Sequence, residues 1–224
     1  MTLSFDCFWS FRSPYSYLLT PRLAALERNY DVRGTVRIVR PLAVRSPDFF
    51  ASGDPLWVSS LMRDTVRTAQ FLGLPYRWPR PDPVRMDMAT RTYPVEQPHI
   101  HRLSRLGQLA AERGRGLPFI VAVSDLIWSG RTDDWHEGDH LARAAAAAGL
   151  DLAEMDAVLA REGGRLAAAI EANEADQRAA GHYGVPLMAF NGEPFFGQDR
   201  FDQLLWRLRE AGLAPRSHST GDPA

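Results

Sequence analysis

Residues 8–18, which decide the fold, read Phe-Trp-Ser-Phe-Arg-Ser-Pro-Tyr-Ser-Tyr-Leu. Aromatic and β-compatible residues precede this stretch, and apolar residues recur at helical spacing after it. Ser13 is a good N-cap, and Pro14 suits the first helical position, where a missing N–H costs nothing. The pattern predicts that a strand ends and a helix begins here, with Ser13 at the junction. Ser13 is then either a simple cap or part of a functional site, because a helix start favours an anion or a thiolate.

The segments after this junction predict a βαβ unit followed by a long helical block. A helix over residues 14–29 and a β-branched, alternating strand over 32–39 complete the unit, whose two strands should be parallel. Residues 40–55 and the proline-rich residues 75–98 are expected to be irregular. Helical patterns lie at 56–72, 100–113, 117–128 and 138–148, then from a capping box at Asp151 and Glu154, and again at 165–180.

The end of the chain returns to strands. Short strands at 187–191 and 194–196 are joined by Asn191-Gly192, a strong hairpin signal, and a helix follows over 198–210. This order predicts an α/β protein with a thioredoxin-like fold and a large all-helical insertion. We expect the thioredoxin-like domain at 1–45 and 183–213, the helical insertion at 46–182, and a disordered tail at 214–224.

Composition and charge narrow the class of protein. The chain has 224 residues, of which 45% are hydrophobic, and its formal net charge is -1, so no basic footprint for nucleic acid is present. No apolar run is long enough to span a membrane, and the first residues lack the layout of a signal peptide. The one cysteine, Cys7, excludes an intrachain disulfide and is expected to be a buried, inert thiol. A cytoplasmic protein is the simplest interpretation.

Three short motifs resemble signatures of the DsbA-like superfamily. They are Ser-Pro-Tyr-Ser-Tyr-Leu at 13–18, Gly-Val-Pro at 184–186 and Phe-Gly-Gln-Asp-Arg at 196–200. The likeness covers residues 3–210 and is greatest to 2-hydroxychromene-2-carboxylate isomerase and the kappa-class glutathione transferases. Redox members of the superfamily carry Cys-Pro-x-Cys where this chain has Ser-Pro-Tyr-Ser at 13–16. A hydroxyl cannot exchange disulfides, so oxidoreductase chemistry is not expected.

The resemblance implies a glutathione site. Ser13 would stabilise the thiolate of bound glutathione, which makes it the predicted catalytic residue without being the nucleophile. Val185 and a cis Pro186 would face the peptide part of glutathione. Gln198 and Asp199 would hold the γ-glutamyl end, Asp199 by pairing with the ammonium group.

One loop departs from the family pattern. The family usually has a lysine followed by Gly-Asn after the second strand, whereas this chain has Phe50 near the lysine position and then Ser52-Gly53-Asp54. Asp54 can accept a hydrogen bond and is kept as a predicted glutathione contact, but it lacks the two amide donors of Asn. The change bears mainly on substrate identity. Residues 76–79 resemble the family's wall over the substrate pocket.

We therefore predict a glutathione-dependent isomerase that acts on an aromatic or unsaturated carboxylic acid and forms a homodimer, as similar proteins do. A kappa-like glutathione transferase is one alternative. A non-catalytic glutathione-binding relative is another, and the altered loop is its main support.

A remote alternative is a zinc hydrolase. His136, Glu137 and His140 fit the H-E-x-x-H pattern, in which two histidines one helical turn apart bind zinc. Gly138 and the acidic residues before the motif favour a loop over a helix, and no third ligand is evident beyond Glu154 or Glu162. His182, just before the Gly-Val-Pro motif, either lines the site or is structural.

Overall fold

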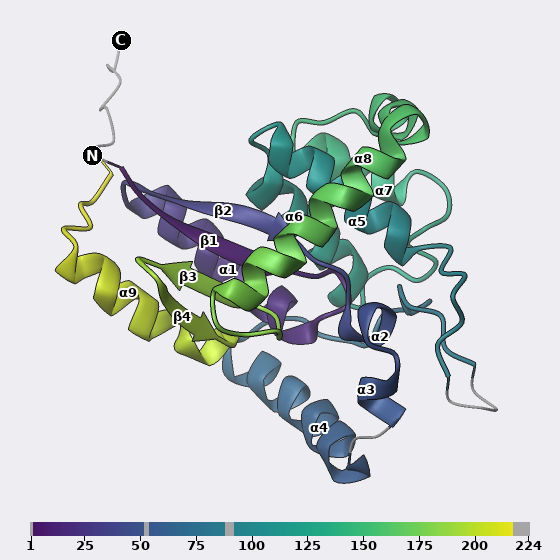
Figure 1. Ribbon diagram of the computed structural model, residues 1–224, viewed down its shortest axis with the longest axis horizontal. Helices are drawn as coiled ribbons and strands as arrows, with labels where there is room; N and C mark the ends of the chain where they lie inside the picture. The colour runs from purple at the N-terminus through teal and green to yellow at the C-terminus, as the bar shows by residue number, and fades with distance from the viewer. Residues whose placement is uncertain (1, 52–53, 88–91, 217–224) are drawn as a thin grey trace.

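The computed structural model describes residues 2–51, 54–87 and 92–216. The strands are β1 (Leu3–Trp9), β2 (Val32–Ile38), β3 (Leu187–Phe190) and β4 (Glu193–Phe196). The helices are α1 (Pro14–Asn29), α2 (Leu42–Arg45), α3 (Asp48–Ala51), α4 (Pro55–Phe71), α5 (Ile100–Glu112), α6 (Gly116–Trp128), α7 (His140–Ala147), α8 (Leu152–Ala179), η1 (Gln198–Arg200) and α9 (Phe201–Glu210), as Figure 1 shows. None of the described helices is long and apolar enough to cross a membrane.

The strands form one mixed sheet in the order β2-β1-β3-β4. β1 runs parallel to β2, with Trp9 opposite Ile38, and antiparallel to β3. β3 and β4 form a hairpin, in which Asn191 and Gly192 have φ values of 51° and 80°. Two successive positive φ angles are what a two-residue hairpin turn of the favoured hand needs, so Asn-Gly stands there. The predicted α/β thioredoxin-like fold is confirmed.

Helices cover both faces of this sheet. On one face, Leu19 of α1 and Leu204 of α9 pack with Cys7 of β1 and Met188 of β3. On the other face, α8 crosses in front of the strands in Figure 1, and Phe8 and other apolar residues are buried close to its end. Because successive strand residues point to opposite faces, burial on both faces explains why β1 is apolar at consecutive positions.

The inserted helices share their core with the sheet. Trp9 and Ile38 belong to the same apolar cluster as Leu103 of α5, Phe119 of α6 and Ile170 of α8. α8 is also tied to β2 by a hydrogen bond from the Asn173 side chain to the Ile38 carbonyl, at 3.0 Å. The sheet therefore fixes the position of α8 and of the segment that leaves it.

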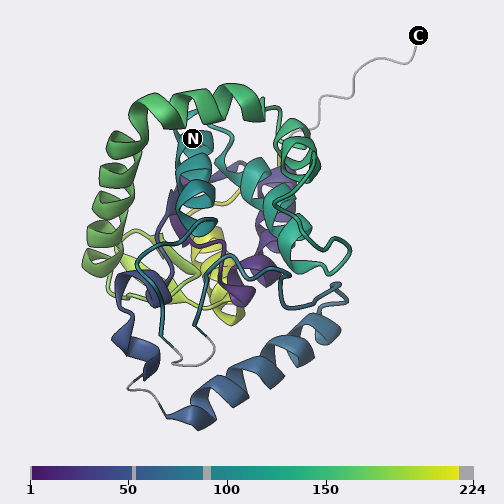
Figure 2. The same ribbon diagram turned by 90° about the vertical axis from the view of Figure 1, so that its right-hand side faces the viewer.

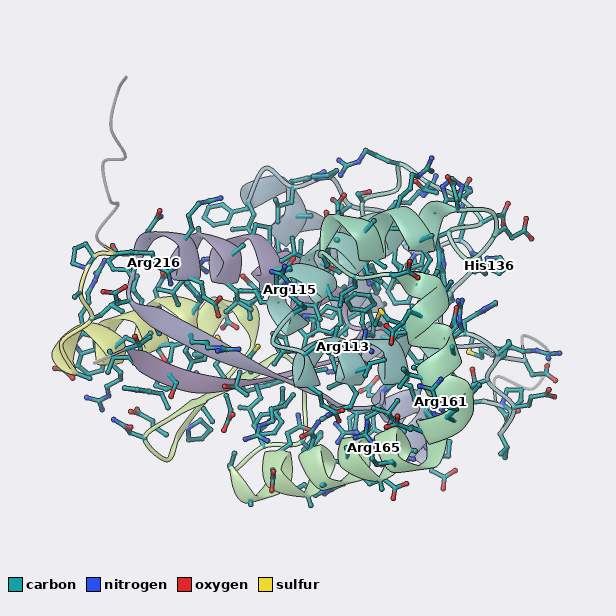
Figure 3. The ribbon with its side chains drawn as sticks, turned by 90° about the horizontal axis from the view of Figure 1, so that it is seen from above. Arg113, Arg115, His136, Arg161, Arg165 and Arg216 are labelled. Atoms are coloured by element: carbon teal, nitrogen blue, oxygen red, sulfur yellow. The ribbon has the colours of Figure 1, made fainter. Side chains whose placement is uncertain are left out.

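The helix pattern at 151–180 needs a correction. The two helices expected there are one helix, α8, which runs through Gly163 and Gly164. Figure 2 shows that this continuous helix bends sharply partway along its length. Ion pairs tie it to α5 and to the C-cap of α5: Arg113 with Glu154, and Arg165 with Glu112, in the region labelled in Figure 3. Packing against α5 outweighs the roughly 1 kcal/mol that each interior glycine costs relative to alanine.

The start of α7 and the tail also differ from expectation. Gly138 has a φ of 55°, which no right-handed helix contains, so the helix predicted from residue 138 begins at His140. The predicted tail starts too early, because the Asp31 N–H donates to the Ala214 carbonyl and the Arg216 N–H to the Asn29 carbonyl, both at 2.9 Å. Residues 217–224 lie outside the described residues.

Candidate functional site

Ser13 lies where the sequence places it, between β1 and α1. Its Oγ caps α1 by accepting from the Ser16 N–H at 3.2 Å, and Pro14 follows at the first helical position. The same hydroxyl donates to the carbonyl of Val185, at 3.3 Å. The bond between Val185 and Pro186 is cis, as predicted. Residues 172 positions apart in the sequence are thus in direct contact.

Four successive carbonyls after α8 are each held by a different donor. The Tyr183 carbonyl accepts from Arg45 Nη2 at 2.5 Å, and the Gly184 carbonyl from Gln177 Nε2 at 2.7 Å. The Val185 carbonyl accepts from Ser13, and the Pro186 carbonyl from the Gly197 N–H at 2.9 Å. We call residues 183–186 the acceptor segment. Because every one of its carbonyls is bonded, its backbone is fixed before any ligand arrives.

Two backbone donors remain available beside Ser13. Among the described residues, the N–H groups of Tyr15 and Val185 have no acceptor. Pro14 brings no N–H, and Ser16 and Tyr17 donate to the Ser13 side chain and carbonyl. Unpaired N–H groups at a helix start favour an anionic ligand group, so this corner of the molecule suits a thiolate or carboxylate.

The predicted γ-glutamyl end is at the start of η1, which abuts α1. Arg22 of α1 donates to the Gln198 carbonyl at 3.3 Å. Asp199 is 60% exposed and pairs with Arg200 at 3.4 Å. Burial and the Asp64 hydrogen bond raise the pKa of Tyr15, and the Asp199 charge adds to that rise. The Asp199 charge therefore acts on the Tyr15 hydroxyl.

Asp54 is not part of this hydrogen-bonded set. Among the described residues, its carboxylate accepts from the Leu56 N–H at 2.8 Å, which caps α4. Asp64, which contacts the helix of Ser13, lies ten residues further along α4, about 15 Å at the rise of an α-helix. Ser52, Gly53 and the side chain of Phe50 lie outside the described residues.

A second set of contacts reaches the same helix start from the insertion, and the sequence did not reveal it. Arg12, whose side chain is only 14% exposed, binds Asp82 through Nε and Nη2, the latter at 3.0 Å. Trp78 Nε1 also donates to Asp82, at 3.1 Å, and the Arg12 guanidinium lies 5.3 Å from the Trp78 ring. Tyr15 donates to Asp64 of α4 at 2.6 Å. The partners are 49 and 70 residues apart, so no local spacing signals them.

His182 and Cys7 prove to be structural. His182 Nδ1 accepts from the Gly184 N–H at 2.8 Å, and its ring stacks on Phe196 with centroids 3.8 Å apart. Burial lowers the pKa of His182. Cys7 is buried in β1, where desolvation raises the pKa of its thiol to about 12. A thiol in this environment is not a nucleophile, which agrees with the expectation of an inert cysteine.

The structure does not support a zinc site of the H-E-x-x-H type. Such a site requires His136 and His140 on one helix, but α7 begins at His140, and His136, which is labelled in Figure 3, lies in the preceding turn. His136 packs instead against the ring of His99, with centroids 4.5 Å apart. Within the described residues, no group of three or more His, Cys, Asp or Glu side chains could hold a metal ion.

Comparison with known proteins assigns the fold family. A model of the DSBA-like thioredoxin domain matches residues 5–209. The chain belongs to this family. The sequence's resemblance to the DsbA-like superfamily is thus confirmed over nearly the whole fold.

Several solved structures share the fold of this chain and are distant from it in sequence. A 2-hydroxychromene-2-carboxylate isomerase has a TM-score of 0.69 and 18% identity, over 93% of this chain and 96% of that one. A probable DsbA oxidoreductase from Streptomyces coelicolor has a TM-score of 0.63 and 19% identity, over 99% and 94%. The cytosolic disulfide reductase DsbM from Pseudomonas aeruginosa, solved with GSH, has a TM-score of 0.56 and 20% identity, over 92% and 100%. No curated protein sequence matches.

Proposed function

We propose that the chain is a glutathione-dependent isomerase of the 2-hydroxychromene-2-carboxylate isomerase type, acting on an aromatic or unsaturated carboxylic acid. One observation carries the proposal: the Ser13 hydroxyl, at a helix start, is bonded to the Val185 carbonyl beside two unpaired backbone N–H groups. A cysteinyl peptide needs O–H or N–H donors for its sulfur anion and backbone groups that can hydrogen-bond to its amide, and these groups can provide both. The only cysteine is buried, so the sulfur must come from a ligand.

The residues have distinct roles in this proposal. Bound glutathione would supply a thiolate that adds reversibly to an unsaturated carbon and so permits rotation about the former double bond. Ser13 would exchange its present acceptor, the Val185 carbonyl, for the sulfur, and the carbonyl would become free for an N–H of the peptide. Asp199 would pair with the γ-glutamyl ammonium and the start of η1 at Gln198 would receive the carboxylate. Asp54 stays a predicted contact of lower priority, because its carboxylate already caps α4.

A titration and an assay test the proposal together. Calorimetry should detect binding of glutathione and of S-methylglutathione, which has the same peptide but no ionisable thiol. Absorbance should report loss of 2-hydroxychromene-2-carboxylate with glutathione only. No binding of either peptide at millimolar concentration would overturn the proposal.

Two alternatives give different results in the same experiment. A kappa-like transferase would release a stable glutathione conjugate of an electrophilic aromatic substrate instead of an isomer. A non-catalytic relative, favoured by the engagement of Asp54 as a cap, would bind both peptides and turn over neither substrate. We also propose a homodimer, which sedimentation analysis would test.

A further inference from the structure

Two of the four donors to the acceptor segment, the side chains of Arg45 and Gln177, have no assigned role. Arg45 is the last residue of α2, and Gln177 lies in the last turns of α8. They also bind one another, Arg45 Nη1 donating to Gln177 Oε1 at 2.9 Å. The result is a closed set of bonds: Arg45 to Tyr183, Gln177 to Gly184, and Arg45 to Gln177.

The surroundings of both side chains argue against an incidental contact. Gln177 is completely buried, and both ends of its amide are used. Arg45 is half-buried, and its hydrogen-bond partners among the described residues are neutral oxygens, not carboxylates. A guanidinium placed against a backbone carbonyl instead of an acid loses solvation without a full charge partner. Such a placement is expected where the hydrogen bond from the guanidinium serves to fix the position of the carbonyl.

We infer that Arg45 and Gln177 are positioning residues, which act on the site through the backbone of residues 183–185. The acceptor segment turns its carbonyls inward to these donors, and this orientation leaves the Val185 N–H available and aims the Val185 carbonyl at Ser13. Without Gln177, the buried Gly184 carbonyl loses its donor and the segment must move to reach water. The effect on glutathione rests on the proposed function, whereas the effect on the backbone does not.

The same helix supplies a matched control. Asn173 lies one turn before Gln177, is also buried, and also donates to a backbone carbonyl, but that carbonyl belongs to Ile38 in β2. The test compares Gln177→Met with Asn173→Leu, each of which keeps the approximate length of the side chain and removes the amide. Arg45→Ala and Arg45→Lys form a second pair on a less buried residue, and lysine restores one donor.

Three measurements on the full chain decide the outcome: amide hydrogen exchange of a peptide covering 183–187, the Kd of glutathione, and the urea midpoint. We expect both amide variants to lower the midpoint to a similar degree. Only Gln177→Met should raise exchange of 183–187 tenfold or more and weaken glutathione about tenfold. Arg45→Ala should do the same to a smaller degree, and Arg45→Lys should recover part of the loss.

The inference is overturned if Gln177→Met and Asn173→Leu change exchange and affinity equally, or if neither Gln177→Met nor Arg45→Ala changes them. If Gln177→Met does not fold, the arginine pair decides alone. If the unmodified chain does not bind glutathione, the proposed function fails, and hydrogen exchange still decides whether the two residues hold the segment.

Discussion

The helix start at Ser13 is held from two sides in different ways. On one side lies the acceptor segment, each of whose four backbone carbonyls accepts a hydrogen bond from the rest of the chain. On the other side lies the insertion, which reaches residues 12–17 through side chains. Examples are Arg12 with Asp82 and Tyr15 with Asp64 of α4, a helix that Figure 2 shows along the edge of the molecule.

The two sides of the helix start therefore tolerate sequence change differently. We call the acceptor segment with its donors the segment half of the site, and the insertion residues that bind residues 12–17 the insertion half. Backbone carbonyls accept in the same way whatever side chain stands at 183 or 185, but a Cβ at Gly184 would clash with the Phe196 ring. The segment half therefore depends on the fold, on Gly184 and on the side-chain donors Ser13, Arg45 and Gln177. The insertion half depends on the identity of the side chains at both ends of each contact, so a substitution on either side can release it. A glutathione site at the acceptor segment and a substrate wall formed by the insertion would agree with this division.

The largest expected effect comes from breaking the insertion half at its buried ion pair. Asp82→Ala leaves the nearly buried Arg12 guanidinium without its carboxylate, and removing one partner of a buried pair typically costs about 3 kcal/mol. Urea unfolding would measure the loss. Asp156→Ala is the control, because its partner Arg102 is 40% exposed and such surface pairs contribute about 1 kcal/mol or less. Equal losses would contradict the assignment of Arg12 to a buried pair.

Ser13→Ala tests the contact between the two halves. Removing one positioned donor to a developing charge commonly lowers kcat by about 100-fold or more, and we expect that loss in the glutathione-dependent assay. The lost cap should cost about 1 kcal/mol of stability. Asp151→Ala removes the equivalent cap of α8, where Oδ1 accepts from the Glu154 N–H at 2.9 Å, and should cost similar stability with full activity. Undiminished turnover in Ser13→Ala would remove Ser13 from the catalytic site.

Tyr15→Phe weakens the insertion half in a pH-dependent way. The hydrogen bond from Tyr15 lowers the pKa of Asp64, with Arg67 contributing. A depressed carboxyl pKa adds stability above the unfolded value, near 4, and loses it as the pH falls through the lower folded value. Because Asp64 is partly exposed, we expect about 1 kcal/mol at pH 7 and almost nothing near pH 2.

Tyr17→Phe is the control for this pH dependence. Tyr17 donates to the Pro75 carbonyl, which does not titrate, at 2.5 Å. Its loss should therefore be the same at both pH values in urea unfolding. Parallel pH profiles for the two variants would show that the Tyr15 hydroxyl does not act through Asp64.

The sequence predicted the features that local chemistry determines. A serine followed by proline at a strand end predicted the helix start, and Asn191-Gly192 predicted the hairpin. Both structures depend on the backbone angles of neighbouring residues. Cys7 was recognised as inert from its place in an apolar strand. The family resemblance, and not local spacing, supplied the expectation that Pro186 is cis and faces Ser13.

The contacts that the sequence could not reveal depend on tertiary structure. Arg45 meets the Tyr183 carbonyl across 138 residues, and no periodic pattern links them. The sequence predicted two helices over 151–180, whereas packing on α5 favours a single helix through Gly163 and Gly164. Asp54 was considered only as a ligand, although an acidic residue followed by proline is also a common helix start.

The smallest expected effect distinguishes a ligand contact from a helix-start charge at Asp199. If Asp199 pairs with the γ-glutamyl ammonium, Asp199→Asn should raise the Kd of glutathione several-fold. Its kcat at saturating glutathione should not change, because an interaction present equally in the ground and transition states alters KM alone. Asp202→Asn is the control, since Asp202 lies in the first turn of α9 and pairs with Arg22. A charge that only offsets the helix dipole contributes a few tenths to about 1 kcal/mol, so Asp202→Asn should lower stability slightly and leave affinity unchanged. If Asp199→Asn behaves in the same way as Asp202→Asn in both measurements, Asp199 is a helix-start charge and the γ-glutamyl end of glutathione must be held by other groups.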